Sequence, residues 1–213
     1  MIDSLGNFAR GTLLGFSIAA PVGPIGVLCI RRTLAEGRAT GFATGLGAAV
    51  ADGMYGAMAA FGLTWLTEAL VGHATWIRLA GGLFLLWLGL TTFLAKPASE
   101  AANAGGAGLA GAFGSTFVLT LTNPMTVLSF VAVFAGLGLG AAGAGHGSAA
   151  ILVAGVVVGS AAWWLLLSAG VDRLRHRFDA NAMRWVNRIS GVVIMAFAAW
   201  SLAGAIPRFA ERT

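Results

Sequence analysis

Charged residues divide this chain into six long apolar runs, and this pattern restricts its fold more than any other feature. A helix needs about 20 apolar residues to cross the hydrocarbon core of a bilayer, and slightly shorter runs suffice when their flanking residues reach the interface. The six runs have suitable lengths and cover residues 11–30, 40–67, 79–95, 109–139, 148–171 and 189–206. The sequence therefore predicts an all-α integral membrane protein with six spans, or with five if the first run is re-entrant.

The composition supports a lipid environment. Only 10% of the 213 residues are charged, and 58% are hydrophobic. A soluble domain carries roughly 25% charged residues, so this chain could not cover a water-facing surface. Disordered chains are polar and rich in charge, which excludes that class as well. The 32 glycines are spread through the apolar runs, as is typical of helices that pack closely in lipid.

The net charge of +5 comes from basic residues at the ends of the apolar runs. No aromatic residues interleave with them in a basic stripe, so we expect no nucleic-acid partner. Basic residues concentrate in cytoplasmic loops of membrane proteins. If both termini lie outside, nine of the 13 Lys and Arg residues fall in cytoplasmic loops, and the opposite orientation would reverse this bias. We therefore expect both termini on the outer side.

The two halves of the chain resemble each other in sequence. A single transmembrane domain, residues 1–213, would contain repeat A (6–95), a linker (96–108) and repeat B (109–206). The matched positions are, in order, 24–28 with 124–128, Gly47 with Gly155, Asp52 with Ser160, and 78–81 with 188–191. Each half has three spans, so the second copy would be inserted upside down, as in many secondary transporters. Chance alignment of glycine-rich helices is the alternative explanation.

Prolines fall in the middle of the first and fourth runs. Pro21, Gly23 and Pro24 interrupt the first, and Asn123 with Pro124 interrupts the fourth. Proline lacks a backbone donor and clashes with the preceding turn, so each helix should break there. Paired breaks in two halves indicate a substrate site near the midplane, and the half-helix beginning near Gly23 would offer free amides to a carboxylate. We expect the side chains of Thr120, Thr122 and Asn123 to add polar contacts. A kink needed only for packing is the alternative.

Asp52 is the one acidic residue within a predicted span. A charged carboxylate in the bilayer costs several kcal/mol, so it should bind a proton or pair with a cation. Tyr55 lies three residues further along the same helical face, within reach of a hydrogen bond to this carboxylate. Asp52 therefore becomes the candidate coupling residue, or the partner of a substrate ammonium. The alternative is a structural aspartate satisfied by neighbouring hydroxyl groups.

Two stripes of small residues follow four-residue spacing. They consist of Gly37, Gly41, Gly45, Ala49 and Gly53 in the second run, and of Gly155 and Gly159 in the fifth. Such stripes predict close helix crossings. Trp163 and Trp164 lie beside the second stripe, where packing is a simpler role than an aromatic wall around a substrate.

Signatures of enzymes and ATP-driven pumps are absent from the sequence. The three histidines, His73, His146 and His176, have no metal-ligand spacing, and no P-loop occurs. We therefore expect no catalytic residue, no bound metal and no cofactor.

The first block of motif residues resembles the N-terminal signature of the LysE/RhtB superfamily of amino-acid exporters. It includes Gly15-Phe16, Pro21-Val22-Gly23-Pro24, Arg31, the glycines at 37, 41, 45 and 47, Asp52 and Tyr55. The segment 122–130 is similar to the second signature of that superfamily. Many members have Pro-Gly-Pro where this chain has Pro21-Val22-Gly23-Pro24, and Lys where it has Met125.

The resemblance implies a bacterial inner-membrane exporter of an amino acid or related small metabolite, coupled to the proton gradient. Its partners would be that substrate and membrane lipid; whether copies associate into a homo-oligomer is left open. The candidate site would then combine Asp52 and Tyr55 with Pro21, Gly23 and Pro24 in the first run and Thr122, Asn123 and Pro124 in the fourth. Export of an inorganic cation and a non-transporting assembly role are the alternatives. An electron conduit would need more than the single Cys29.

Overall fold

A computed structural model describes residues 2–21, 23–61, 73–95, 108–123, 126, 130 and 146–204 of the protein. Within these residues the fold is helical and contains no strand. In chain order the elements are α1 (Ile2–Ala19), α2 (Pro24–Glu36), α3 (Arg38–Ala60), α5 (Ala74–Phe93), α7 (Gly108–Leu121), α9 (His146–Asp172), the short 3₁₀ helix η1 (Arg175–Arg177) and α10 (Ala180–Ala203). The predicted all-α class is confirmed for this part of the chain.

The lengths of the helices bear on the predicted number of spans. Judged by length and composition, the stretches His146–Arg177 and Asn181–Ala203 could each cross a membrane. The bent pair Ser4–Ala19 and Pro24–Glu36 would add a third span if it crosses as one unit. Leu79–Phe93 and Gly108–Leu121 are apolar but shorter, and parts of the second and fourth runs lie outside the described residues. Six spans therefore stay a prediction.

The first run breaks where its prolines predict. α1 ends at Ala19, α2 begins at Pro24, and the two helices meet at an angle of 82°. Pro24 occupies the first turn of α2, where its missing amide hydrogen has no helical acceptor in any case. The bend fits both a broken span and a re-entrant loop. In the fourth run α7 ends at Leu121, and Pro124 lies outside the described residues.

Several helices extend beyond the apolar runs into charged sequence. α2 continues through Arg31 and Arg32 to Glu36 and is capped by Gly37, whose φ of 98° would be strained for a residue with a side chain. α10 begins within the charged segment, because the Asp179 side chain accepts a hydrogen bond of 2.7 Å from the Ala182 amide and caps the helix. The ends of the apolar runs therefore do not coincide with the ends of these helices.

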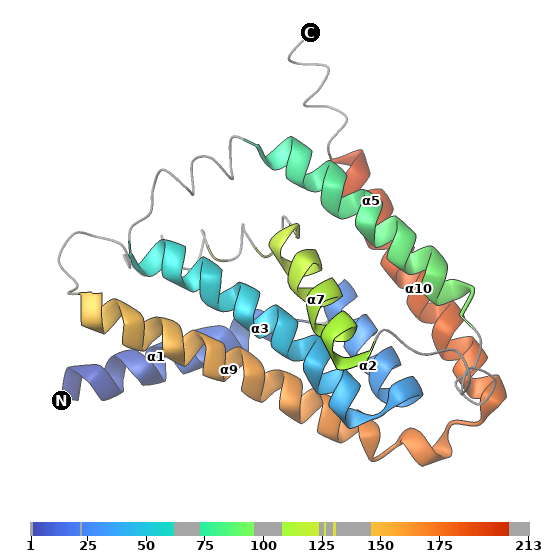
Figure 1. The fold of residues 1–213 in the computed structure, drawn as a ribbon, viewed down its shortest axis with the longest axis horizontal. Coiled ribbons are helices and arrows are strands. Elements are labelled where there is room, and N and C mark those ends of the chain that lie inside the picture. Colours follow the sequence, from blue (N-terminus) through green and yellow to red (C-terminus); the bar gives the residue numbers. More distant parts are fainter. Residues whose placement is uncertain are drawn as a thin grey trace, which may run out of the picture.

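The helices form two groups joined by α2. α1 packs against α9, α9 against α3, and α3 against α7, whereas α5 packs against α10 (Figure 1). α2 contacts both α3 and α10 and so links the two groups. Buried residues of the shared core come from each side of this junction, including Leu28 of α2, Leu119 of α7 and Ile194 of α10.

Glycines allow close approach at the helix crossings, as the small-residue stripes predict. A Cβ atom added at Gly155 would meet the carbonyl oxygen of Phe8 and the amide of Thr12 on α1. One added at Gly47 would meet the carbonyl oxygen of Phe113 on α7. These backbones touch directly, so any larger residue would push the helices apart.

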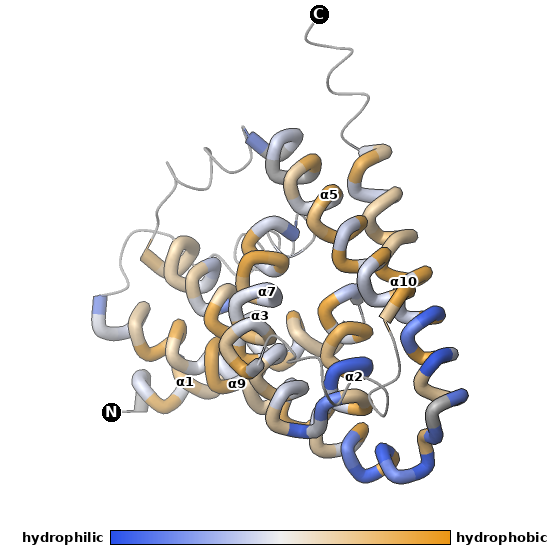
Figure 2. Tube along the Cα trace, turned by 45° about the vertical axis from the view of Figure 1, so that its right-hand side comes forward, coloured by the Kyte–Doolittle hydropathy of each residue, from blue (hydrophilic) through white to orange (hydrophobic). Residues whose placement is uncertain are grey.

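Hydrophilic residues gather toward one end of the molecule. Figure 2 shows them where α2 ends, where α3 begins and along the connection from α9 to α10, while the helices themselves are mainly apolar. Arg175 ties the parts of this end together, because its Nε donates to the Leu34 carbonyl at 3.0 Å. Basic residues of both halves, Arg175 and those at the end of α2 among them, therefore share one end of the fold.

The Gly155 contact gives a test of this packing. We expect Gly155→Val to lower the free energy of unfolding by about 1–3 kcal/mol, because the new side chain would overlap the α1 backbone. Gly170→Val on the same helix is the matched control: a Cβ there has nothing within 4 Å, and its effect should stay within about 0.5 kcal/mol. Thermal unfolding of the detergent-solubilised proteins measures both, and equal effects would contradict the close α1–α9 contact.

Candidate functional site

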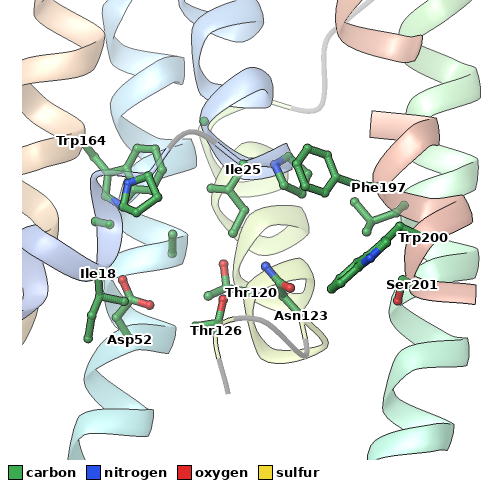
Figure 3. Close-up of a pocket in the computed structure, with 17 residues that line it drawn as sticks. Ile18, Ile25, Asp52, Thr120, Asn123, Thr126, Trp164, Phe197, Trp200 and Ser201 are labelled. Carbon is green, nitrogen blue, oxygen red and sulfur yellow. The ribbon is translucent and has the colours of Figure 1, made fainter. Parts of the chain in front are cut away.

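A cavity of about 270 Å³ lies where the two groups of helices meet. The break between α1 and α2, the end of α7, and side chains of α3, α5, α9 and α10 form its wall (Figure 3). Polar side chains face it at five positions: Asp52, Thr120, Asn123, Thr126 and Ser201. Most of the remaining wall is apolar, with the aromatic rings of Trp164, Phe197 and Trp200. A wall that is mostly apolar with a few convergent polar groups is typical of small-molecule sites.

Backbone amides of α2 border the cavity at the break. Gly23 is the N-cap of this helix, and no side chain caps it. The first amide with a helical acceptor is that of Val27, which donates to the Gly23 carbonyl at 3.0 Å. The amides of Ile25 and Gly26 therefore lack a helical acceptor, and both residues line the cavity. This helix end offers donors to an anionic group.

Asp52 lies in the wall of the cavity with only 4% of its surface exposed. Its Oδ2 atom accepts a hydrogen bond of 2.7 Å from Ser160 Oγ on α9. The indole of Trp164 donates in turn to Ser160 Oγ at 3.2 Å. Within the described residues the Ser160 hydroxyl is the carboxylate's one hydrogen-bond donor. Because a carboxylate can accept several hydrogen bonds, Asp52 can still bind a proton or a cation from the cavity.

Tyr55 does not bond to Asp52, so that expectation is wrong. The phenol of Tyr55 instead donates to the Leu121 carbonyl at 2.6 Å. Leu121 is the last residue of α7, and carbonyls at a helix end have no intrahelical partner. The hydroxyl satisfies one such carbonyl at the break in the fourth run, and Tyr55 is not part of the cavity wall.

The structure brings together some of the predicted site residues and separates others. Pro21, Gly23, Pro24, Asp52 and Asn123 all line the cavity. Thr122 does not line it, and its hydroxyl donates to the Val118 carbonyl at 2.9 Å along its own helix. Pro124 lies outside the described residues.

No pattern in the sequence indicated that α10 lines the cavity. Phe197, Trp200 and Ser201 lie in an apolar run whose lipid-facing and cavity-facing residues are of the same type. Trp164 packs against Gly45, as the sequence predicts, and it also lines the cavity. Trp163 packs edge-on against Phe16 instead, with ring centroids 5.3 Å apart. The alignment of Asp52 with Ser160 was the one signal that pointed to the carboxylate's partner.

The Asp52–Ser160 hydrogen bond can be tested by substitution. We expect Ser160→Ala to lower the free energy of unfolding by about 1–3 kcal/mol, because the buried carboxylate loses its donor. Ser168→Ala on the same helix should cost less, since that hydroxyl donates to the Leu165 carbonyl of its own helix. Thermal unfolding in detergent compares the two variants, and a larger effect for Ser168→Ala would contradict the assigned bond.

Comparison with known proteins places the chain in a family. Residues 16–203 match the family described as LysE type translocator. A Bacillus subtilis (strain 168) protein named "Putative amino acid efflux protein YcgF" is 26% identical over 89% of this chain and 92% of its own length. The "Uncharacterized membrane protein YahN" of Escherichia coli (strain K12) is 29% identical over 79% of this chain and 77% of its own. No solved structure matches significantly. The chain belongs to the LysE type translocator family of membrane proteins.

Proposed function

We propose that the protein is a secondary transporter that exports an amino acid or a related small metabolite from the cytoplasm by proton antiport. The observation that carries this proposal is the position of Asp52, a buried carboxylate that faces the same cavity as the amides at the α1–α2 break. An amino acid carries a carboxylate and an ammonium, and the cavity offers a partner to each. The B. subtilis relative is named for amino-acid efflux, which agrees with this assignment.

The substrate would bind with its two charged groups at opposite polar parts of the cavity. Its carboxylate would accept hydrogen bonds from the amides of Ile25 and Gly26, where the helix dipole also favours negative charge. Its ammonium would pair with Asp52. The apolar and aromatic wall would then surround the side chain, which favours an uncharged one. A second cationic group would lose its hydration without a second carboxylate among the described lining residues.

Antiport follows if the proton and the substrate ammonium compete for Asp52. A charged carboxylate buried in the membrane without a cation is unfavourable by several kcal/mol. Asp52 would therefore bind either the substrate ammonium or a proton whenever the protein switches between its inward-open and outward-open states. Release of the substrate on the outer side would be followed by protonation there, and the proton would leave to the cytoplasm.

A transporter of this kind needs two equivalent closed states, one for each side of the membrane, and an inverted repeat would supply them. The directions of the helices support such a repeat. α1 runs parallel to α9, since Gly11 meets Leu152 and Phe16 meets Trp163; α7 runs parallel to α3, since Gly47 meets Phe113 and Tyr55 bonds Leu121. α3 crosses α9 antiparallel, because Gly45 meets Trp164 while Gly53 meets Val157. The first elements of the two halves are therefore antiparallel to each other, and so are the second.

The contact between Asp52 and Ser160 gives independent support to the repeat. These residues are counterparts in the alignment of the two halves, and their side chains form a hydrogen bond of 2.7 Å. A residue and its symmetry counterpart can touch only close to the two-fold axis that relates them. The proposed axis would therefore pass beside Asp52, at the wall of the cavity.

Alternating access would occur by movement of the α5–α10 pair relative to the other helices. Two contacts would close the cavity region, one in the first half of α5 and one just beyond its last residue. Gly81 lies against the backbone of Thr122. At the second contact Arg31 Nε donates to Asn187 at 3.0 Å, and Asn187 donates to the Ala95 carbonyl at 3.0 Å. Opening one contact while the other stays closed would expose the cavity to one side at a time.

The first test of the proposal is flux into proteoliposomes. We expect a pH gradient to drive the uptake of radiolabelled L-leucine by the wild type, and L-lysine to compete weakly because its side chain is charged. Asp52→Asn should abolish the gradient-driven component, since an amide cannot carry a proton. Asp172→Asn, which changes the same charge at the end of α9 outside the cavity, should retain it.

Three other outcomes of the flux measurement would each contradict part of the proposal. Unchanged gradient-driven flux in Asp52→Asn would remove Asp52 from coupling. Flux of an inorganic cation without flux of any amino acid would favour the cation exporter instead. No flux of either kind from well-folded protein would favour a non-transporting role.

The second test concerns orientation in the inner membrane, where we propose that both termini face outward. Cys29 is fully buried, so a single introduced cysteine would report alone. A membrane-impermeant maleimide should label Ser4→Cys in intact spheroplasts, and label His176→Cys only after permeabilisation. The reverse pattern would overturn the proposed orientation.

A further inference from the structure

A second cavity, of about 210 Å³, lies between α2, α5 and α7 at the end of the molecule where the basic residues gather. Arg31, Arg32 and Glu36 of α2 face it from one side, and Thr91 and Thr92 of α5 from the other. It shares no lining residue with the cavity at Asp52. The substrate pathway proposed above does not use any of these five side chains for binding.

Arg32 is buried, although the sequence places it at the end of an apolar run as a loop residue. Only 8% of its surface is exposed. Its terminal nitrogens donate to neutral oxygens: to Ala112 O at 3.0 Å, to Ser115 Oγ at 2.9 Å, and to the hydroxyls of Thr44 and Thr116 at 3.2 and 3.3 Å. Within the described residues no carboxylate pairs with it. The exposed Glu36 attracts this guanidinium from the end of α2, and an anion within the cavity would add a counter-charge at the buried group itself.

Two further groups beside Arg32 have unused hydrogen-bonding capacity. Arg31 uses its Nε for Asn187, and none of its four terminal N–H groups has an acceptor among the described residues. Thr92 has 2% of its surface exposed, and its hydroxyl has no hydrogen-bond partner within the same part of the chain. Buried polar groups are normally satisfied, so the hydroxyl of Thr92, together with the half-buried guanidinium of Arg31, indicates a site for a ligand that accepts hydrogen bonds.

The donor set suits a carboxylate. Guanidinium groups bind carboxylates through paired N–H donors, and a hydroxyl can add a third hydrogen bond. Glu36 lines the same cavity and is exposed, so it offers a partner to an ammonium group at the solvent side. The carboxylate and ammonium of an amino acid therefore match the buried and the exposed parts of this cavity.

We propose that this second cavity is a carboxylate-binding site that loads the substrate from the cytoplasm before it reaches Asp52. α2 connects the two sites, because its first turn borders one cavity and its last turns border the other. Its 13 residues span about 20 Å. The inference rests on the proposed function for its direction, since the basic end must face the cytoplasm. The existence of the carboxylate site does not depend on transport.

A binding test in detergent examines the site without transport. Sodium butyrate and sodium sulfate, at ionic strength matched with sodium chloride, are titrated against the melting temperature of purified protein. Butyrate should stabilise wild type and Asp52→Asn, and its apparent affinity should fall about tenfold in Arg31→Gln and Thr92→Val. Arg38→Gln, an exposed arginine outside the cavity, is the matched control and should behave as wild type. An unchanged butyrate response in Arg31→Gln, or equal stabilisation by sulfate, would overturn the site.

A transport test examines the loading role. Inside-out vesicles present the cytoplasmic face, and right-side-out vesicles present the outer face. Thr92→Val should raise the KM for L-leucine about tenfold in inside-out vesicles and leave it unchanged in right-side-out vesicles, with Thr92→Ser restoring it. Equal changes in both orientations would indicate a structural role and overturn the loading site. Butyrate binding without any amino-acid transport would overturn the proposed function and leave the carboxylate site intact.

Discussion

The loss of backbone hydrogen bonds between Ala19 and Pro24 is the constraint on which the rest of this structure depends. Two prolines within four residues cannot continue a helix, so amides and carbonyls lose their partners in the middle of an apolar run. Lipid cannot satisfy such groups, and they persist only where protein or a polar cavity covers them. Here α2 turns away at 82°, and the amides of Ile25 and Gly26 border the cavity that Asp52 also faces. The break therefore adds backbone donors to the cavity that side chains alone would not supply.

Close helix packing keeps the opposite side of this cavity in place. Gly155 and Gly47 let backbones of α1 and α7 touch α9 and α3, so these four helices form one tightly packed group. The α5–α10 pair is attached mainly through α2 and through single contacts at its two ends. A tightly packed group beside a more weakly attached pair fits the proposed movement, because the glycine-mediated contacts need not change when the pair shifts.

Part of the fold and of the candidate site could be predicted from sequence. The break at Pro21–Pro24 and the packing role of the glycine stripes follow from local chemistry, and the structure confirms both. Local chemistry did not predict the hydrogen-bond partner of Tyr55, the hydrogen bond of Thr122 or the contribution of α10 to the cavity. Tyr55 reaches Leu121 on another helix, and Thr122 turns to its own helix. Such choices depend on how far each helix is rotated and shifted against its neighbour, which no local pattern encodes.

The sequence alone determined the membrane class, the position of the first break and the residues that carry the family resemblance, because each depends on composition or on a residue's own backbone chemistry. Tertiary structure decided which side chains meet. In lipid both the buried and the lipid-facing sides of a helix are apolar, so periodicity does not reveal the face that lines a cavity. The burial of Arg32 shows this most clearly. Because Arg32 follows an apolar run, the sequence predicts that it lies in a loop. Only the packing of α7 against α2 and α3 buries it and surrounds it with neutral oxygens.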